Sequence, residues 1–588
     1  MPEQVERFGV AAIQFEPTLG AKTANVESLL ELTRDACARG AALIVLPEMA
    51  TTGYCWYDRA EVRPYVEPIP GPTTDAVAAL AREHRCWIVV GMPEVDPATD
   101  VFYNAAALIG PGGVAGVYRK SHSADSEGKW AGDGDLGLPV WETPLGRLGI
   151  LICADAHYVE PARVLALQGA DVLCLPANWQ GAPCPPDSWI ARAWENGCYL
   201  AAANRHGVER GIQFGGGSCV IDPDGAVMAR QGEGDGIVLA QIDVARARTR
   251  AFAPGLPPEK VSARRPDLYD AVTLNTYLYN PLEFHGLYGH RPLPRGGRSR
   301  VAVAQMAPTP GDVRTNLRTI EGALAGLAGP VDLVVFPEYA LTGRPSCAAE
   351  VVDRAQPTSP PWLDELVDFA RRYQTALVVG YLERAGEACY STALAVGGDG
   401  ELGRARKAHP IAGEAEWCRP GPDRPPVIDL EHMRVGVLVG TDLCFPEAAR
   451  ALALDGCDLL AVPAGSGLPP VVGAAGPGMP VVDAAALHLA RLRAVENACY
   501  VACASAPSSG GVGWSGVFAP ERGPRAEEGL IPPDATGVSL REVDTTNLAT
   551  PFPTSVVRAK ESLRRRRPEL YALLQHPRPP ALDLFGAM

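Results

Sequence analysis

Basic residues are in deficit in this sequence. Its 588 residues include 53 Lys and Arg against 68 Asp and Glu, which gives a net charge of −15. Nucleic acids and anionic membranes bind basic surfaces, so the sequence argues against either of them as the main partner. The rest of the composition is that of an ordinary globular protein, with 47% hydrophobic and 21% charged residues, and it has no signature of disorder.

Long hydrophobic runs are also missing. The longest apolar runs, such as ALIVLP and DLVVFP, have the length of a strand, whereas a membrane-spanning helix needs about 20 apolar residues. The first residues, MPEQVERFG, lack the basic and apolar regions of a secretory signal. We therefore expect no membrane partner and a cytoplasmic location.

Paired cysteines are absent although the chain has 15 of them. No two form a CxxC pair, and none lies in a Cys/His cluster with the spacing of a zinc site. In a reducing cytosol these cysteines are expected to be free thiols, most of them small apolar core residues. The cysteines therefore predict no metal site.

What the sequence does contain is a copy of itself. VAAIQFEPTLGAKTAN, ALIVLPEMATTGY and RAWENGCYLAAAN are echoed by VAVAQMAPTPGDVRTN, DLVVFPEYALTGR and RAVENACYVACAS. The offset drifts only from 287 residues, between Lys120 and Lys407, to 302 residues, between Pro266 and Pro568. So small a drift over the whole length indicates duplication of an entire domain.

Each repeat alternates short apolar runs with amphipathic stretches. VAAIQF, ALIVLP, WIVVG, LGILIC and VLCLPA predict buried strands, and ANVESLLELTRDACARG and TTDAVAALAREHR predict helices with a 3.6-residue period. Buried strands that alternate with helices indicate a layered α/β domain. We predict domains at 1–274 and 299–588, joined by the aromatic, Pro- and Gly-rich connection 275–298.

Three reactive residue types follow predicted strands of the first repeat: Glu48, Lys120 and Cys153. Such positions face the crevice in which α/β proteins place their sites. A thiol is mostly protonated at neutral pH, so a carboxylate that removes its proton activates it. A fixed ammonium stabilises a thiolate or an oxyanion. Each residue alone is ordinary, but the three together favour a nucleophilic cysteine enzyme.

These residues stand in motifs that resemble the nitrilase, or carbon–nitrogen hydrolase, superfamily. The motifs are ALIVLPE, VYRKSH, GRLGILICAD and RAWENGCYL, in the family's order, and the resemblance covers nearly the whole chain twice. It implies an αββα sandwich in which Glu48, Lys120 and Cys153 are the base, the lysine and the nucleophile. It also implies acyl-enzyme chemistry on Cys153, an oxyanion held by Lys120 and the backbone N–H of Ala154, and no metal or organic cofactor.

The family has a second glutamate shortly after the lysine, and Glu127 fits that position. It lies seven residues after Lys120, as Glu414 lies seven residues after Lys407. Each glutamate is followed three residues later by a tryptophan, Trp130 or Trp417. The matched spacing predicts that Glu127 completes the catalytic set and orients Lys120 and the substrate.

The second repeat departs from the pattern at the nucleophile. Aligning LGILICADAHYVEPAR with VGVLVGTDLCFPEAAR places Gly440 opposite Cys153, while Glu338, Lys407 and Glu414 remain. Glycine has no nucleophile, so we expect a degenerate domain and one acyl group per chain. Since members of the family pair as homodimers, we hypothesise that the second repeat completes an intramolecular pseudo-dimer, with further homo-oligomers left open.

The substrate is expected to be a small amide or nitrile. The segment that begins at Cys153, CADAHYVEP, resembles the CxDxxxPE motif of amidases and carbamoyl hydrolases. The segment EGKWAGDGD resembles nitrilases instead. We favour amide hydrolysis over nitrile hydrolysis. Two other hypotheses are that the enzyme transfers the acyl group to an amine, and that the chain is a non-catalytic binding protein. The candidate substrate-binding residues, beside the oxyanion residue Ala154, are Tyr54, Trp130, His157, Asn178 and Trp179.

Overall fold

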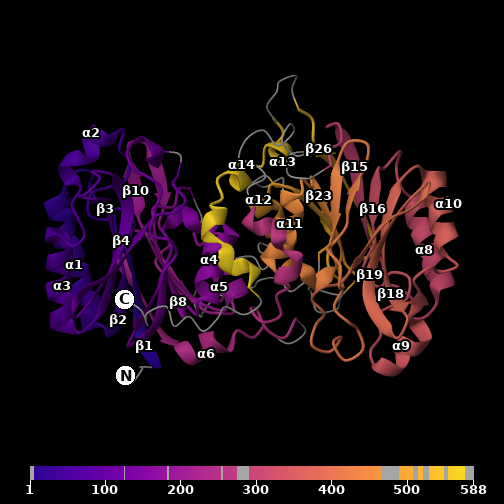
Figure 1. Ribbon diagram of the computed structural model, residues 1–588, viewed down its shortest axis with the longest axis horizontal. Coiled ribbons are helices and arrows are strands. Elements are labelled where there is room, and N and C mark those ends of the chain that lie inside the picture. Colours follow the sequence, from indigo (N-terminus) through magenta and orange to yellow (C-terminus); the bar gives the residue numbers. More distant parts are fainter. Residues whose placement is uncertain are drawn as a thin grey trace. The chain divides into compact units, whose positions relative to one another are not determined.

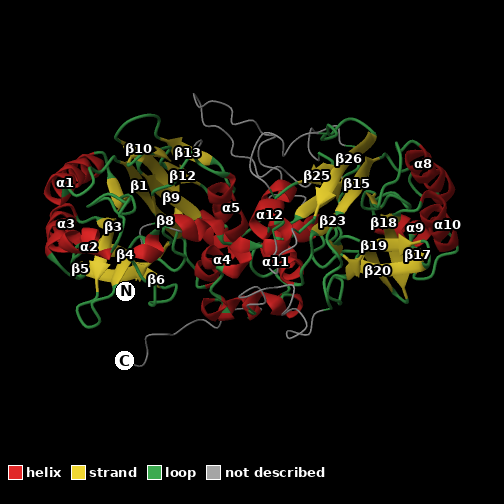
Figure 2. Cartoon of the chain, turned by 90° about the horizontal axis from the view of Figure 1, so that it is seen from above, coloured by secondary structure: helices red, strands yellow, loops and turns green. Residues whose placement is uncertain are grey.

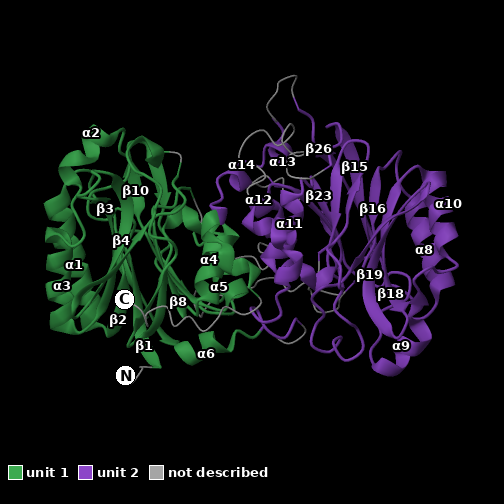
Figure 3. Ribbon diagram, viewed as in Figure 1, with its two compact units in different colours: residues 1–251, 471–486, 569–588 green, residues 252–470, 487–568 purple. Residues whose placement is uncertain are grey.

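The computed structural model describes most of the chain (Figure 1). The described residues are 6–124, 126–181, 184–252, 256–274, 291–465, 489–507, 514–520, 529–547 and 554–576. Among them, no helix is both long enough and apolar enough to cross a membrane. They form two compact units. The described parts of unit 1 lie within Met1–Ala251 and Glu569–Met588, and those of unit 2 within Phe252–Pro470 and Leu487–Pro568 (Figure 3).

Unit 1 contains two six-stranded sheets among its described residues. The first sheet has the order β14 (Gly236–Asp243), β1 (Arg7–Gln14), β2 (Ala41–Val45), β3 (Trp87–Val95), β4 (Phe102–Gly110) and β5 (Gly113–Arg119). The second has the order β13 (Val227–Arg230), β12 (Cys219–Ile221), β9 (Tyr199–Asn204), β8 (Val172–Ala177), β7 (Gly146–Ile150) and β6 (Val140–Thr143). A hairpin, β10 (His206–Glu209) and β11 (Ile212–Gly215), stands apart.

Helices cover the outer faces of these two sheets. α1 (Lys22–Ala38) and α3 (Pro72–His84) flank the first sheet, and α4 (Val159–Leu167) and α5 (Asp187–Asn196) flank the second (Figures 1 and 2). Short helices α2 (Arg59–Val62) and α6 (Val244–Thr249) complete the described part of this unit. The layers run helix, sheet, sheet, helix, so the predicted αββα sandwich is confirmed.

The amphipathic pattern explains the outer layer. The buried residues of α1 include Leu29, Thr33 and Ala36, which recur at helical spacing. α3 begins with Pro72, whose fixed φ suits the first helical position, and it is followed by Arg85 in the left-handed conformation. Both helices pack on apolar residues of β2 and β3 such as Ile44.

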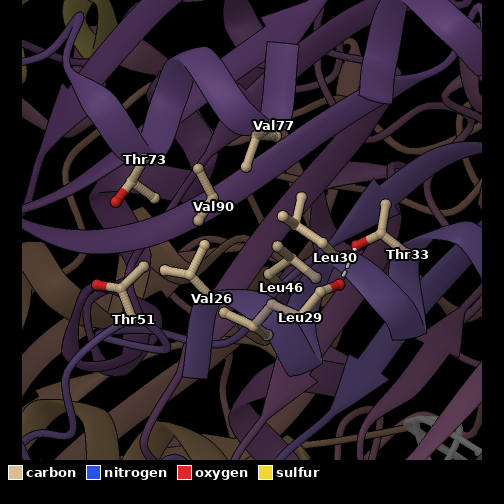
Figure 4. A pocket seen from close by; sticks show the side chains of 9 residues that line it. All are labelled: Val26, Leu29, Leu30, Thr33, Leu46, Thr51, Thr73, Val77 and Val90. Atoms are coloured by element: carbon tan, nitrogen blue, oxygen red, sulfur yellow. Dashed lines mark hydrogen bonds between the residues drawn. The ribbon is translucent and has the colours of Figure 1, made fainter. Parts of the chain in front are cut away.

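A cavity of about 10 Å³ lies in this layer (Figure 4). It has room for about one water molecule, and apolar side chains of α1, α3 and β3, together with Leu46 just after β2, line most of it. The hydroxyl of Thr33 donates to the Leu29 carbonyl at 2.6 Å, while the hydroxyl of Thr51 has no hydrogen-bond partner among the described residues. The cavity is a packing void, too small for a substrate. Its lining is Val26, Leu29, Leu30, Thr33, Leu46, Thr51, Thr73, Val77 and Val90.

Unit 2 repeats the sandwich. One sheet has the order β20 (Gly400–Arg406), β19 (Ala388–Gly397), β18 (Ala376–Ala385), β16 (Leu333–Val335), β15 (Arg298–Gln305) and β26 (Gly537–Asp544), with β17 (Gln356–Pro357) paired to β18. The other has the order β21 (Val427–Asp429), β22 (Arg434–Val437), β23 (Leu459–Pro463), β24 (Tyr500–Ala504) and β25 (Gly516–Phe518). The described helices are α8 (Val313–Ala325), α9 (Ala348–Arg354), α10 (Leu363–Tyr373), α11 (Pro446–Leu454), α12 (Leu489–Asn497), α13 (Val556–Ala559) and α14 (Glu561–Arg564).

The compact units do not coincide with the sequence repeats at their ends. Residue 252 and residues 256–274, the C-terminal tail of the first repeat, belong to unit 2, and the described residues 569–576, in the C-terminal tail of the second repeat, belong to unit 1. The domain boundaries at 274 and 299 stay a prediction about the repeats, and most of the predicted connection, 275–290, lies outside the described residues.

Candidate active site

The functional side chains of unit 1 follow the ends of its strands. Glu48 comes three residues after β2, Lys120 directly after β5, Cys153 three residues after β7 and Asn178 directly after β8. β2 is parallel to its sheet neighbours β1 and β3, and β8 to β7 and β9. The carboxyl ends of parallel strands lie at one edge of each sheet, and the hydrogen bond from the Asn178 N–H to Glu48 joins the loops of the two sheets.

Glu48 is fully buried and held by three donors. Its Oε1 accepts hydrogen bonds from Lys120 Nζ and from Asn104 Nδ2, both at 2.7 Å. Its Oε2 accepts one from the backbone N–H of Asn178 at 2.8 Å. The carboxylate is thereby fixed in one orientation, as a positioned base requires.

Lys120 bridges the two glutamates. Its Nζ donates to Glu48 Oε1 at 2.7 Å and to Glu127 Oε1 at 2.5 Å. Burial disfavours the ammonium, but the charges of Glu127 and Glu48 outweigh it and hold the pKa of Lys120 well above its usual range. Burial raises the pKa of Glu127, which Lys120 opposes and Glu48 reinforces. The site therefore keeps a permanent cation at its centre.

Cys153 opens a 3₁₀ turn, Cys153–His157, in a strained backbone conformation with φ of 43°. Its side chain is buried, and burial together with the charge of Glu48 raises the pKa of its thiol well above the usual value. Lys120 and the backbone amide of Asn178 act in the opposite direction. The resting group is therefore a thiol, and such a thiol becomes a nucleophile only when a base removes its proton.

A close backbone approach places Glu48. A Cβ atom at Gly91 of β3 would lie 2.4 Å from the Pro47 carbonyl oxygen and 2.7 Å from Glu48 Cα. The second repeat has the same crowding, because a Cβ at Gly380 would lie 2.6 Å from Glu338 Cα. Only glycine lets the loop that carries the glutamate pass so near the neighbouring strand.

The predicted substrate-binding residues fall into two groups. Tyr54 and Asn178 contact the charged residues directly: the Tyr54 hydroxyl donates to Glu127 Oε1 at 2.7 Å, and Asn178 donates its backbone N–H to Glu48. Trp130 is buried in a cluster with Tyr54. The half-buried His157 packs on Trp179, with ring centroids 4.3 Å apart.

Two further buried residues belong to this site and were not predicted from the sequence. Asn104 of β4 donates to both Glu48 and Glu127, the latter at 3.2 Å. Glu209 accepts the backbone N–H groups of Tyr54 at 2.8 Å and Cys55 at 2.6 Å, and so fixes the loop that carries the Tyr54 hydroxyl. Asn104 has Ser391 at its place in the second repeat, so comparing the repeats gives no signal for it.

Unit 2 keeps the charged residues but has glycine in place of Cys153. Lys407 Nζ lies 2.8 Å from both Glu338 and Glu414. Gly440 begins the equivalent 3₁₀ turn, Gly440–Cys444, with φ of 49°. Gly465 stands where unit 1 has Asn178, and Arg344 where it has Tyr54. The charge triad has survived, while the groups around it have changed.

Comparison with known proteins bears on the family of this chain. A family model described as carbon–nitrogen hydrolase matches residues 9–252 and again 300–519. The chain is 38% identical over 243 residues to a nitrilase of Pyrococcus abyssi, covering 41% of this chain and 92% of that protein. It is 33% identical over 297 residues to an N-carbamoylputrescine amidase of Solanum lycopersicum, covering 46% and 97%.

A deaminated glutathione amidase of Homo sapiens is 34% identical over 271 residues, covering 42% of this chain and 80% of that protein. Each of these alignments spans most of the relative but less than half of this chain, which is the share of one repeat. The family model accounts for the other half by its second match. The chain therefore belongs to the carbon–nitrogen hydrolase family, carries the family's domain twice in tandem, and is an amidase-like hydrolase.

Proposed function

We propose that unit 1 hydrolyses primary amides or N-carbamoyl compounds through a thioester on Cys153. Glu48 takes the thiol proton while Sγ attacks the carbonyl carbon, and the negative charge that forms on the carbonyl oxygen is stabilised by Lys120 and the backbone N–H of Ala154. The tetrahedral intermediate releases ammonia, which carries away the proton held by Glu48. Water then attacks the thioester, Glu48 accepts its proton, and the acid leaves with the thiol restored.

The observation that carries the choice of an amide is a set of buried polar atoms without partners. Glu127 Oε2 and both side-chain atoms, Oδ1 and Nδ2, of Asn178 have no hydrogen-bond partner among the described residues. Glu127 is fully buried, and Asn178 is 3% exposed. Leaving such groups unpaired costs about 1–3 kcal/mol each, so their presence favours a ligand that pairs with them.

The chemistry of these atoms matches an amide better than a nitrile. Glu127 Oε2 and Asn178 Oδ1 are acceptors, and a primary amide or ureido nitrogen carries two N–H donors. A nitrile has no donor to offer them. Both residues border the Glu48–Lys120 pair, since Glu127 binds Lys120 and Asn178 binds Glu48. The amide nitrogen is therefore assigned to these two acceptors in the bound substrate.

The test is a matched trio of substrates that share one acyl chain: the primary amide, the N-carbamoyl amine and the nitrile. The nitrile is included as the alternative substrate, because the relative from Pyrococcus abyssi is named a nitrilase. We expect kcat/KM for the amide or the N-carbamoyl compound to be at least about tenfold higher than for the nitrile, because only the first two can form the buried hydrogen bonds. Ammonia release should vanish in Cys153→Ala.

Asn178→Leu provides the second arm. It should lower kcat/KM for the amide about 10- to 100-fold while leaving the slow nitrile rate within about threefold. Equal rates for amide and nitrile in the wild type, or ammonia release that survives Cys153→Ala, would contradict the proposal.

A further inference from the structure

The described C-terminal tail of each repeat belongs to the compact unit built on the rest of the other repeat (Figure 3). In unit 2, the 3₁₀ turn Asp270–Thr273 packs on α11. In unit 1, the corresponding turn near the end of the chain, Ala572–Gln575, packs on α4. The two contacts are the same contact made twice, with the tails exchanged between the repeats.

Each exchanged tail contains a tyrosine that binds a buried histidine. Tyr571 Oη lies 2.7 Å from His122 Nε2 in unit 1, and Tyr269 Oη lies 2.5 Å from His409 Nε2 in unit 2. Both histidines are nearly inaccessible to solvent. Tyr571 is fully buried, although it lies 449 residues from His122 in sequence. A contact kept in both units through a duplication is not an accident of packing.

Each histidine in turn binds an aspartate next to the nucleophile position. His122 Nδ1 lies 2.8 Å from Asp155 Oδ1, and the backbone N–H of His122 donates to the same oxygen at 3.0 Å. In unit 2, His409 Nδ1 lies 2.8 Å from Asp442 Oδ1. An imidazole that donates its Nδ1–H to the aspartate offers Nε2 as an acceptor, and the tyrosine hydroxyl then donates to it.

Asp155 connects this chain of contacts to the catalytic backbone. Its Oδ2 accepts the N–H of Ile152, the residue before Cys153, at 2.9 Å, and the hydroxyl of Tyr118 at 2.7 Å. His122 lies two residues after Lys120, so the same network holds the loops of both groups. Cys153 itself has a left-handed φ, a conformation that persists only where the surroundings fix it.

We propose that Tyr571 is a positioning residue for Cys153, and that the nucleophile-free second repeat contributes to catalysis through its own C-terminal tail. The hydroxyl fixes the His122 ring, the ring fixes Asp155, and Asp155 fixes the backbone at Ile152 and so the direction of the thiol. The oxyanion donor, the N–H of Ala154, belongs to the same turn. The inference rests on the proposed role of Cys153 as the nucleophile.

The test compares Tyr571→Phe with Tyr269→Phe in the full chain. Both remove one hydroxyl from the same buried contact, but only the first lies in the unit that contains a nucleophile. We expect Tyr571→Phe to lower kcat about tenfold with KM within about twofold, and to slow alkylation of Cys153 by iodoacetamide by a similar factor. Tyr269→Phe should keep both rates near those of the wild type, while the two variants unfold at similar temperatures.

The outcomes separate this inference from the proposed function. If Cys153→Ala abolishes activity but Tyr571→Phe keeps the wild-type kcat, Tyr571 does not position the nucleophile. Equal losses of kcat in the two Tyr→Phe variants also overturn the inference, because they indicate a general loss of structure. If Cys153→Ala retains activity, the proposed function itself fails.

Discussion

Cys153 and Gly440 occupy the same backbone position in the two repeats, with φ values of 43° and 49°. The second repeat has kept the strained backbone conformation of the turn but not the cysteine side chain. A Cβ atom at Gly440 would lie 2.8 Å from Glu338 Oε2 and 3.4 Å from Lys407 Cε. A thiol placed there would point at the retained base and lysine after a small shift of the glutamate.

Gly440→Cys therefore tests how much of a site the second unit retains. In a Cys153→Ala background, the substitution should add one iodoacetamide-reactive thiol, which Gly440→Ala, with the same backbone and Cβ, does not add. The crowding against Glu338 should cost about 1–3 kcal/mol of stability. Intact mass and urea unfolding measure the two effects.

Acylation by the amide substrate should stay absent in this variant. Gly465 and Arg344 replace Asn178 and Tyr54, so the groups proposed to bind the amide nitrogen and to contact the second glutamate are missing. A trapped acyl group on the Cys153→Ala, Gly440→Cys chain would show that the charge triad suffices. The wild type should carry one acyl group per chain.

At the scale of the elements, three neighbouring strands of unit 2, β18, β19 and β20, show how the lysine is held. Glu383 of β18 is fully buried and accepts hydrogen bonds from Arg406 at 2.8 and 2.9 Å, from Arg404 at 2.7 Å and from Thr392 at 2.8 Å. Burial opposes the charge, but these donors outweigh it and lower the pKa of Glu383 to about 2. Arg406 directly precedes Lys407, so this ion pair anchors the strand end that presents the lysine.

Glu383→Gln should destabilise unit 2 by about 2 kcal/mol at pH 7. A folded-state pKa near 2 against 4.5 unfolded gives stabilisation that is fully present above pH 4.5. It is lost as the pH falls from 4.5 towards 2, because protonation then removes the charge that the arginines bind. Urea unfolding of wild type and variant at pH 7, 4 and 3 should show the difference shrinking with acid.

Glu387→Gln, at an exposed position in the turn between β18 and β19, is the control and should change stability by less than about 0.5 kcal/mol. If the loss of stability caused by Glu383→Gln increased as the pH fell, Glu383 would not be the charged partner of the two arginines.

The local sequence pattern was enough to predict many strands and helices, but not the long-range contacts that they make. The runs around Ile13, Ile44 and Leu175 were predicted as strands and form β1, β2 and β8, because continuous apolar runs suit a sheet covered on both faces. Glu48, Lys120 and Glu127 could be proposed from the frames that the repeats share. Tyr571 could not be paired with His122, because no local pattern encodes a contact across 449 residues.

At the scale of the whole molecule, the exchange of tails offers a reason for keeping a repeat that lost its nucleophile. A first repeat on its own would lack residues 569–576, which belong to unit 1, and the described part of its own tail, 252 and 256–274, belongs to unit 2. Tyr571 and its contact with His122 would be missing. Each compact unit thus includes the tail of the other repeat.

This dependence predicts complementation between separate halves. Residues 1–290 produced alone should have less than about a tenth of the full-chain kcat, because the groups fixing Cys153 are incomplete. Co-production with residues 291–588 should restore activity, measured as ammonia released per mole of Cys153. The same pairing with Tyr571→Phe in the second half should restore folding but not the rate, whereas Tyr269→Phe in the first half should restore both. Full activity of 1–290 alone would mean that unit 1 fixes its nucleophile without the exchanged tail, and the retention of the second repeat would then require a different physical reason.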